Sequence, residues 1–292
     1  MFSYAAKVDV GVFEDHNDDR VLVGSHILTN GSFSEKTDHP YLVAAICDGV
    51  GGMAQGDRAA MTGLEVMSHL DKPGVTKEEI QEAIELANRR VRNLQSLENL
   101  QNGLRTTIAG IYADKDRFYV YNAGDSRVYR FRGRFFTRLS KDHSLVQDRI
   151  DMGMLTPEEA KVHPQKNIIN KCIGNEEVVN PRIKDLSEDF CYKDILMICS
   201  DGISDEVEDA EFREIIASHA EEEDLAGCCE CIYQKAVERG SRDNMSIILI
   251  RKEDKESERG ENTDNAADGW RPDTDDAANR WESHTNNATE WG

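Results

Sequence analysis

Two apolar runs, far apart in the chain, share one design. Tyr41–Cys47 leads into Asp48, Ile195–Cys199 leads through a serine into Asp201, and a glycine follows each aspartate. A continuous apolar run of this length, bounded by turn residues, is typical of a strand buried on both faces. The glycine lets backbone or ligand approach closely. Each run therefore predicts a buried strand that delivers a carboxylate to the turn at its end.

Helical spacing of apolar residues follows both of these turns, over residues 54–70 and about 205–219. Another helical pattern begins after Thr76, where Glu79 completes a capping box. Its apolar positions keep the 3.6-residue period of a helix: Ile80, Ala83, Ile84, Ala87, Val91 and Leu94. These patterns predict helices that alternate with the buried strands.

Three strand-like segments occupy the middle of the chain, at Thr107–Tyr112, Phe118–Asn122 and Arg127–Phe131. Short polar turns separate them, which predicts an antiparallel meander. The stretch that follows, residues 140–180, is polar, less regular and interrupted by proline. Its composition indicates a mobile lid or flap.

Composition divides the chain near residue 251. Residues 252–292 carry twelve Asp/Glu and five Lys/Arg, a net charge of −7, which leaves −14 of the total of −21 on residues 1–251. The later segment has almost nothing from which to build a core. We therefore predict a folded domain over residues 1–251 and a disordered acidic tail over 252–292. Three tryptophans in the tail are candidates for docking a partner or for folding back on the domain, although an unconstrained tail is favoured.

The acidic charge argues against nucleic acid or an anionic membrane as a main partner, because both attract positively charged surfaces. No apolar stretch reaches membrane-spanning length, and the first residues lack the apolar core of a signal peptide. Seven cysteines, an odd number, favour a reducing compartment. We therefore expect a cytoplasmic protein.

The cysteine positions predict core residues rather than a zinc site. Cys47 and Cys199 lie inside the two buried-strand patterns. Cys228 and Cys231 share one face of a helical pattern over residues 224–238, and no second pair follows at the spacing of a zinc ribbon or finger. Free cysteine of this kind behaves as a small apolar side chain.

Aspartates recur at turns and at the ends of apolar runs. Carboxylates gathered in one site repel each other unless a hard cation lies between them. A site built only from oxygen ligands favours Mg²⁺ or Mn²⁺ over zinc. The sequence therefore predicts a divalent metal site, formed by four segments: Asn17-Asp18-Asp19, Asp48-Gly49, Ser200-Asp201-Gly202 and Arg242-Asp243-Asn244.

These segments and four others resemble, in the same order, the motifs of the metal-dependent type 2C (PPM) serine/threonine protein phosphatases, in their compact bacterial form. The resemblance covers roughly residues 5–251. Any one of the motifs alone would be weak, whereas the ordered series is highly specific. The matching elements are Asn17-Asp18-Asp19, Cys47–Gly52, Arg105-Thr106-Thr107, Gly124–Arg127, Asp142–Ser144, His163-Pro164, Cys199–Gly202 and Gly240–Asn244.

The resemblance implies an α+β fold, a four-layer α-β-β-α sandwich with two mostly antiparallel sheets. It implies a monomeric phosphatase that hydrolyses phosphoserine and phosphothreonine in proteins with a metal-activated water. The implied partners are phosphorylated proteins and a cognate bacterial serine/threonine kinase. The alternative is a catalytically weak or inactive relative that acts as a phosphoprotein-binding scaffold.

The resemblance also implies a core site for two Mn²⁺ or Mg²⁺ ions. By motif position, Asp48 bridges the two ions, and Asp201 and Asp243 complete the first. These three residues are catalytic through the water that the ions activate.

The Gly49 carbonyl and Asp18 or Asp19 would bind the second ion. Strand periodicity points the two aspartates to opposite faces, so one of them would act through water. Asp125 matches the residue that, with Asp201, holds a third and weaker ion in bacterial relatives.

Glu14 is the largest departure from the family pattern. In the family, an arginine three residues before the Asn-Glu/Gln-Asp element binds the substrate phosphate, and here that spacing gives a carboxylate. The group that binds phosphate is therefore unknown, with Arg20 or another arginine as a replacement. Alternatively, Glu14 simply points into solvent. No catalytic role falls to His143 or His163.

Overall fold

The structure, a computed structural model, describes residues 1–50, 55–100, 103–220 and 223–253. Met1–Lys255 forms one unit, and a second unit, Glu256–Gly292, lies outside the described residues. The predicted tail and its tryptophans therefore lie outside the described part of the chain, apart from the first two residues of the tail.

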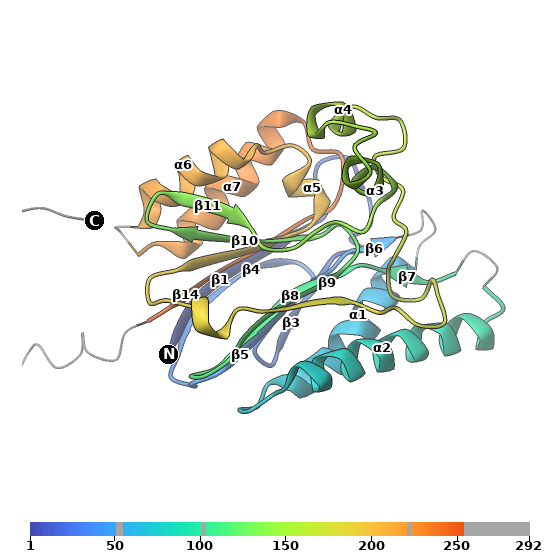
Figure 1. Ribbon diagram of the computed structural model, residues 1–292, viewed down its shortest axis with the longest axis horizontal. Helices are drawn as coiled ribbons and strands as arrows, with labels where there is room; N and C mark the ends of the chain where they lie inside the picture. Colours follow the sequence, from blue (N-terminus) through green and yellow to red (C-terminus); the bar gives the residue numbers. More distant parts are fainter. Residues whose placement is uncertain (51–54, 101–102, 221–222, 254–292) are drawn as a thin grey trace, which may run out of the picture. The chain divides into compact units, whose positions relative to one another are not determined.

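Two antiparallel sheets of six strands each lie face to face (Figure 1). The first contains β1 (Phe2–Asp9), β4 (Gly31–Thr37), β10 (Arg127–Arg132), β11 (Phe135–Arg138), β13 (Ile195–Cys199) and β14 (Met245–Lys252). The second contains β2 (Arg20–Val23), β3 (His26–Leu28), β5 (Leu42–Cys47), β8 (Ile108–Ala113), β9 (Phe118–Ala123) and β12 (Arg182–Asp185). Their strand orders are β11-β10-β13-β14-β1-β4 and β12-β9-β8-β5-β2-β3. A small separate sheet pairs β6 (Gly49–Val50) with β7 (Arg105–Thr106).

Helices cover the outer face of each sheet (Figure 1). The second sheet is covered by α1 (Gly56–Met67), the 3₁₀ turn η1 (Ser68–Leu70) and α2 (Lys77–Leu97). The first sheet is covered by α5 (Asp201–Ser204), α6 (Asp209–Ala220) and α7 (Leu225–Arg239). The remaining helical segments are α3 (Leu145–Asp151), α4 (Pro157–Lys161) and the 3₁₀ turn η2 (Ser187–Asp189).

Three hydrophobic clusters fill the spaces between these layers. One lies between the second sheet and its helices, as in the packing of Leu64 and Ile84. Another lies between the sheets and includes Ile46 and Ile198. The third joins the first sheet to its helices and includes Phe212. Three apolar spaces require four layers, so the predicted α-β-β-α sandwich is confirmed.

The buried strands and the capped helix follow the sequence pattern closely. Every residue of β5 and β13 is buried. The Thr76 side chain accepts from the Glu79 backbone, and the Glu79 side chain accepts from the Thr76 backbone, which forms the predicted capping box of α2. The predicted helix over residues 54–70 is α1 with η1.

The predicted meander is wrong at its last step. β8 and β9 pair as expected, but β9 pairs on its other side with β12, while β10 belongs to the opposite sheet. The chain crosses between the sheets at Gly124, which has φ +124°, and a Cβ built there would lie 2.6 Å from Thr107 Cβ. Glycine alone fits this turn without strain. An alternating pattern predicts strands but not the sheet to which each belongs.

The cysteine prediction is also wrong in part. Cys47, Cys199 and Cys228 are buried as expected, but Cys231 is exposed, with its Sγ 3.6 Å from His219 Nε2. Residues separated by three positions on a helix differ in direction by about 60°. One of the two therefore faces the core while the other lies at its rim.

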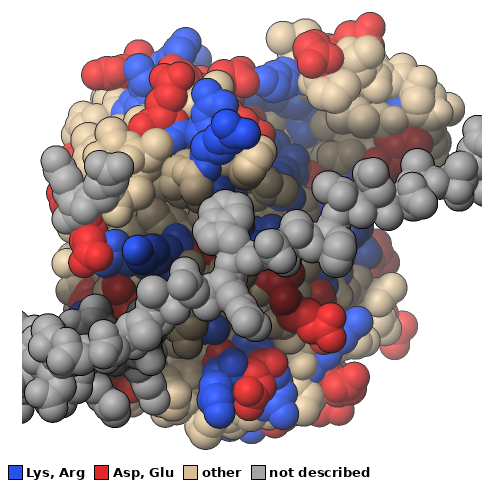
Figure 2. All heavy atoms as spheres, turned by 60° about the vertical axis from the view of Figure 1, so that its left-hand side comes forward, with Lys and Arg blue, Asp and Glu red and all other residues tan. Residues whose placement is uncertain are grey.

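Positive and negative side chains are mixed on one face of the molecule (Figure 2). Figure 2 shows one face on which lysines and arginines lie in several clusters among acidic side chains. Among the described residues, no helix is long and apolar enough to span a membrane.

Candidate metal centre

Strand pairing brings two of the predicted ligands side by side. β2 pairs with β5 in a register that sets Arg20 opposite Cys47. Asp19 precedes the first of these residues and Asp48 follows the second, so both carboxylates leave the sheet at the same edge. Residues in such opposed positions have Cβ atoms about 5 Å apart.

The backbone of Asp48 is held on both sides by the two threonines of the Arg-Thr-Thr motif. Thr106 Oγ1 and the Thr107 amide both donate to the Asp48 carbonyl, at 2.9 and 2.8 Å, and the Asp48 amide donates to Thr107 Oγ1 at 3.1 Å. Both threonines are completely buried. This clamp fixes the backbone from which the Asp48 carboxylate projects.

The first sheet brings Asp201 and Asp243 to the same edge. β13 pairs with β14, with Cys199 opposite Ile247, so the turn before β14 adjoins the start of α5. A Cβ built on Gly202 would lie 3.3 Å from Asp243 Cβ. The glycine after Asp201 is therefore needed for the close approach of these two segments.

Asp18 lies beside Gly49 rather than in the core. Its Oδ1 accepts a hydrogen bond of 3.0 Å from the Asp57 amide at the start of α1. A Cβ built on Gly56 would lie 2.9 Å from both Asp18 Cγ and the Gly49 carbonyl oxygen. The Asp18 carboxyl group and this carbonyl thus approach the same point from two segments, as the predicted second ion requires.

Asp19 occupies a deeper position, with 1% of its surface exposed. Its Oδ2 accepts a hydrogen bond of 2.7 Å from Ser246 Oγ on β14. The two neighbouring aspartates therefore point to different environments, although both precede β2 and neither lies in a strand. Asp18 is the one that lies next to Gly49.

The carboxyl groups at this edge strongly disfavour each other's ionisation. Burial first, and then repulsion from Asp201 and Asp19, raise the pKa of Asp48 well above its usual range. Burial and repulsion from Asp125 and Asp243 do the same to the pKa of Asp201. Burial raises the pKa of Asp19 to about 7 and that of Asp125 to about 6. Such a cluster is stable at neutral pH when cations replace the protons.

The donor set fits hard divalent cations. The converging ligands are carboxylate and carbonyl oxygens, which Mg²⁺ and Mn²⁺ prefer. Oδ1 of Asp125 is buried and has no hydrogen-bond partner among the described residues. An unpartnered buried carboxylate oxygen is costly, so this atom is suited to a cation that approaches from the adjoining cavity.

Two residues that the sequence reasoning missed lie next to Asp18. Among the described residues, His16, Asp18 and Asp57 form the one group whose potential metal-ligating atoms all lie within 4.8 Å of one another. His16 Nε2 lies 3.3 Å from Asp18 Oδ1 and 3.7 Å from Asp57 Oδ2. The predicted ligands of the first ion, Asp48, Asp201 and Asp243, do not bring their carboxylate oxygens within this distance of one another. The available signal was a histidine two residues before Asp18 and an aspartate opening the next helix.

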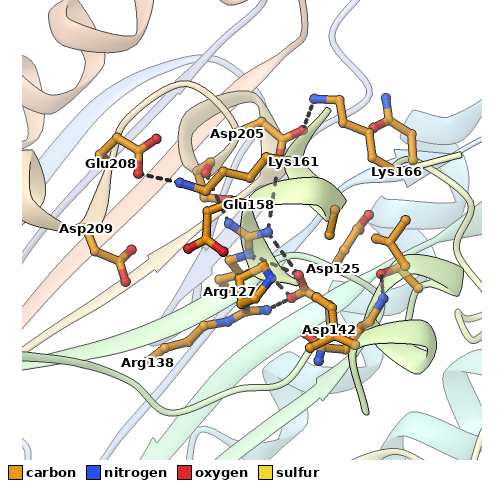
Figure 3. A pocket seen from close by; sticks show the side chains of 18 of the residues that line it. Asp125, Arg127, Arg138, Asp142, Glu158, Lys161, Lys166, Asp205, Glu208 and Asp209 are labelled. Carbon is orange, nitrogen blue, oxygen red and sulfur yellow. Dashed lines mark hydrogen bonds and ion pairs between the residues drawn. The ribbon is translucent and has the colours of Figure 1, made fainter. Parts of the chain in front are cut away.

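A cavity of about 480 Å³ adjoins Asp125 (Figure 3). Arg127 crosses its floor and binds Asp142 through Nε and Nη2, at 3.2 and 2.9 Å from Oδ2. The same guanidinium donates through Nη1 to the Ser204 carbonyl at 3.1 Å. One arginine therefore joins the Gly-Asp-Ser-Arg motif, the Asp-His-Ser motif and the turn that follows Asp201.

Two ion pairs tie the 140–180 segment across this cavity (Figure 3). Lys161 Nζ lies 2.5 Å from Glu208 Oε2, and Lys166 Nζ lies 2.7 Å from Asp205 Oδ2. The segment predicted as a flap is thus bound to the residues between α5 and α6, beside the metal-ligand cluster.

His143 has a structural position. Its Nδ1 accepts a hydrogen bond of 3.3 Å from the Gly124 amide. Burial, and then the charge of Lys171, lower the pKa of His143 to about 4. The ring is therefore neutral at pH 7 and serves as an acceptor at the crossover between the sheets.

The structure shows the surroundings of Glu14, which stands where the family has its arginine, and of Arg20, the candidate replacement. Glu14 is exposed and, within the described part of the chain, makes no hydrogen bond or ion pair. Arg20 is buried, and its Nη1 donates to the Asn17 and Asp19 carbonyls at 2.7 Å each. Because Arg20 holds the loop together, it is not free to replace the missing arginine.

Fold and site together define an α-β-β-α sandwich protein with a divalent-cation centre at one edge of its sheets. Comparison with models of known protein families gives no match. Serine/threonine phosphatase stp of Listeria innocua is 30% identical over 251 residues, which cover 84% of this chain and 93% of that protein. The Mycobacterium tuberculosis serine/threonine phosphatase PstP/Ppp superposes with a TM-score of 0.74 at 27% identity, over 87% of this chain and all of that structure.

A further solved structure, the catalytic domain of serine/threonine protein phosphatase PstP, was crystallised with two manganese ions. It has a TM-score of 0.70 and 25% identity over 87% of this chain and all of that chain. The chain described here belongs to the bacterial PPM family of serine/threonine phosphatases.

Proposed function

We propose that this protein hydrolyses phosphoserine and phosphothreonine in phosphorylated proteins, with Mn²⁺ or Mg²⁺ as cofactor. The observation that carries the proposal is the convergence of aspartates from distant segments at one edge of the sandwich. Its relatives are named as serine/threonine phosphatases, and one of them binds two manganese ions. Two ions in the site supply Lewis acidity for activating water and neutralise phosphate charge.

The contribution of the chain itself is positioning. The threonine clamp fixes Asp48, and Asn244 Oδ1 accepts from the Asp18 amide at 2.7 Å, so that ligands from separate segments keep one geometry. Asp48 is proposed as the bridge between the ions and Asp125 as a ligand of a third. The full proposed ligand set is Asp18, Asp48, Gly49, Asp125, Asp201 and Asp243, with buried Asp19 supporting it.

The proposal extends to partners and organisation. A cognate serine/threonine kinase would generate the substrates, and the protein would act as a monomer. The catalytic domain would comprise residues 1–251, with residues 252–292 as an acidic appendage.

The test is release of phosphate from a phosphothreonine peptide. We expect Mn²⁺-dependent turnover that EDTA abolishes and that fresh Mn²⁺ restores. Running the assay on the full chain and on a chain ending at Glu253 tests the domain proposal, with equal kcat expected. Loss of all turnover in the shortened chain would contradict the proposed domain boundary.

The scaffold alternative makes the opposite prediction. A phosphoprotein-binding relative without catalysis would bind the peptide but release no phosphate at saturating Mn²⁺. The proposed ligand set argues against the scaffold, because all six residues are present and carboxylates gathered in one site repel one another unless a cation lies between them. Peptide binding without turnover in protein that binds Mn²⁺ would favour the scaffold.

Glu14→Arg is expected to improve substrate binding. The carboxylate at this exposed position repels a phosphate dianion, while an arginine attracts it through charge-assisted hydrogen bonds. We expect KM for a phosphothreonine peptide to fall by about tenfold, with little change in kcat. Glu14→Gln, which removes the charge without adding a donor, should give a smaller fall. An unchanged KM in both variants would mean that residue 14 lies away from the phosphate.

A further inference from the structure

A loop beside the metal centre is fixed at both of its ends by one buried side chain. Asn244 Nδ2 donates to the carbonyls of Val10 and His16, at 2.9 Å each. Within this loop, a Cβ built on Gly11 would lie 2.5 Å from the Asp243 carbonyl oxygen. The loop of residues 11–15 is therefore packed against the turn that carries a proposed metal ligand.

This fixed loop presents apolar side chains to solvent. Val12 and Phe13 are 63% and 57% exposed. A single exposed apolar residue is ordinary, but two adjacent ones on a loop that is held in place beside a charged centre form a contact surface. Neither side chain contributes to the three hydrophobic clusters of the fold.

Arg242 lies over this loop. Its guanidinium carbon is 5.1 Å from the centre of the Phe13 ring, a cation–π contact. Arg242 is exposed and, among the described residues, makes no ion pair or hydrogen bond. The aromatic ring holds the guanidinium without neutralising its charge, and the next residue in the chain is Asp243. A free positive charge is thus kept at the rim of an acidic centre.

Two other cations near the centre have carboxylate partners. Arg127 is bound to Asp142, and Lys166 pairs with Asp205. Arg105, opposite Val50 in the β6–β7 pair, is exposed and has no hydrogen bond or ion pair among the described residues. It is therefore the natural comparison for Arg242.

We propose that Arg242, Phe13 and Val12 form the docking point for the phosphorylated segment of a substrate protein. The guanidinium binds the phosphate of the incoming residue, and the two apolar side chains contact an apolar residue next to it. Arginine suits this role because its planar donors match phosphate oxygens in pairs. The inference rests on the proposed phosphatase function and names the substrate feature that the site selects: a phosphoserine or phosphothreonine with an apolar neighbour.

The principal test compares Arg242→Gln with a matched control, Arg134→Gln. Arg134 is also exposed and also lies over an exposed phenylalanine, at 5.3 Å from the ring of Phe135, but on the turn between β10 and β11. We expect Arg242→Gln to raise KM for a phosphothreonine peptide by about tenfold with kcat within about twofold. Arg242→Lys should raise KM less than Arg242→Gln does, and the control should leave KM unchanged.

A second arm tests the apolar contact. Phe13→Ala is expected to raise KM by about fivefold for a peptide with leucine next to phosphothreonine, and to have little effect when glycine flanks it. Equal losses for both peptides would contradict an apolar subsite. Calorimetric Mn²⁺ affinity should be unchanged in the Phe13 and Arg242 variants, which excludes damage to Asp243.

The docking inference is separable from catalysis. A peptide that carries a non-hydrolysable phosphonate is titrated in Mn²⁺ by fluorescence anisotropy, so that binding is measured without turnover. The same rise in Kd is expected for Arg242→Gln. No rise, or a rise in Arg105→Gln alone, would overturn the inference. If the wild-type protein binds the peptide without turnover and Arg242→Gln weakens that binding, the proposed function is refuted while the docking site is supported.

Discussion

Asp201→Asn is expected to lower kcat/KM for a phosphothreonine peptide by about 10³-fold or more, which corresponds to a loss of about 4 kcal/mol of transition-state stabilisation. Asp201 is a proposed ligand of the first ion and, with Asp125, of the third, and only Ser200 separates it from the buried strand β13. Asparagine keeps the shape of the side chain but removes the charge that binds a dication. Initial rates over a range of Mn²⁺ concentrations, together with calorimetric Mn²⁺ affinity, measure the two losses separately.

Asp205→Asn is the matched control for this change. Asp205 lies four residues further on and pairs with Lys166, but it belongs to no proposed ligand set. We expect its loss to lower kcat/KM by less than about tenfold, because a partly exposed ion pair contributes little. An Asp201→Asn protein that is folded and nearly as active as wild type would refute the proposed metal centre. Equal losses in both variants would show only that the region is sensitive to charge.

Strands β5 and β13 were predictable because their information is local. Each is a continuous apolar run followed by an Asp-Gly pair, directly after β5 and after one serine in the case of β13, and each is buried throughout. The same holds for the capping box of α2, in which Thr76 and Glu79 satisfy each other's backbone within one helical turn. Periodicity and caps depend on neighbours in the sequence, so one chain suffices to read them.

Sheet membership was not predictable in this way. β9 and β10 are separated by a short turn, yet they belong to different sheets, because β12 occupies the free edge of β9. That pairing joins residues about 60 positions apart, such as Asn122 and Arg182. Gly124 at the crossover gave a signal for a special turn, but not for the direction that the chain takes after it.

In the candidate site, too, local features were predictable from the sequence and long-range contacts were not. Motif order identified the aspartates, and strand ends placed them at one edge. The supports around them depend on long-range contacts: Asn244 reaches residues more than 220 positions earlier, and Ser246 holds Asp19. Arg20, a candidate for phosphate binding by sequence, instead holds its own loop. Side-chain partners of this kind emerge only from the folded arrangement.

In the metal-free protein, the free energy of unfolding is expected to fall as pH rises. In the metal-free protein, burial raises the pKa of Asp19 to about 7, against about 3.9 for an unfolded aspartate. The folded state therefore binds this proton more tightly than the unfolded state. The stability contributed by this bound proton is complete below about pH 4 and is lost as pH rises through about 7. A shift of about three units corresponds to about 4 kcal/mol.

Asp125, with a pKa of about 6, adds a fall of the same sign over the lower part of this range. We expect the Tm of EDTA-treated protein to drop by about 10 °C between about pH 5 and pH 8, since each kcal/mol shifts Tm by about 2–4 °C in a domain of this size. Mn²⁺ should abolish the fall, because it binds the ionised carboxylates of the folded state alone. Differential scanning calorimetry with EDTA and with Mn²⁺ measures both curves.

Asp189→Asn is the control for this titration. Asp189 lies on the surface, and hydrogen bonds from Arg132 and Arg130 lower its pKa, so its contribution to stability is lost only as pH falls below the usual aspartate range. The variant should therefore keep the wild-type slope above about pH 5, whereas Asp19→Asn should flatten it. A Tm that rises with pH in EDTA would contradict the prediction, because it would mean that the buried carboxylates ionise more readily in the folded protein than in the unfolded chain.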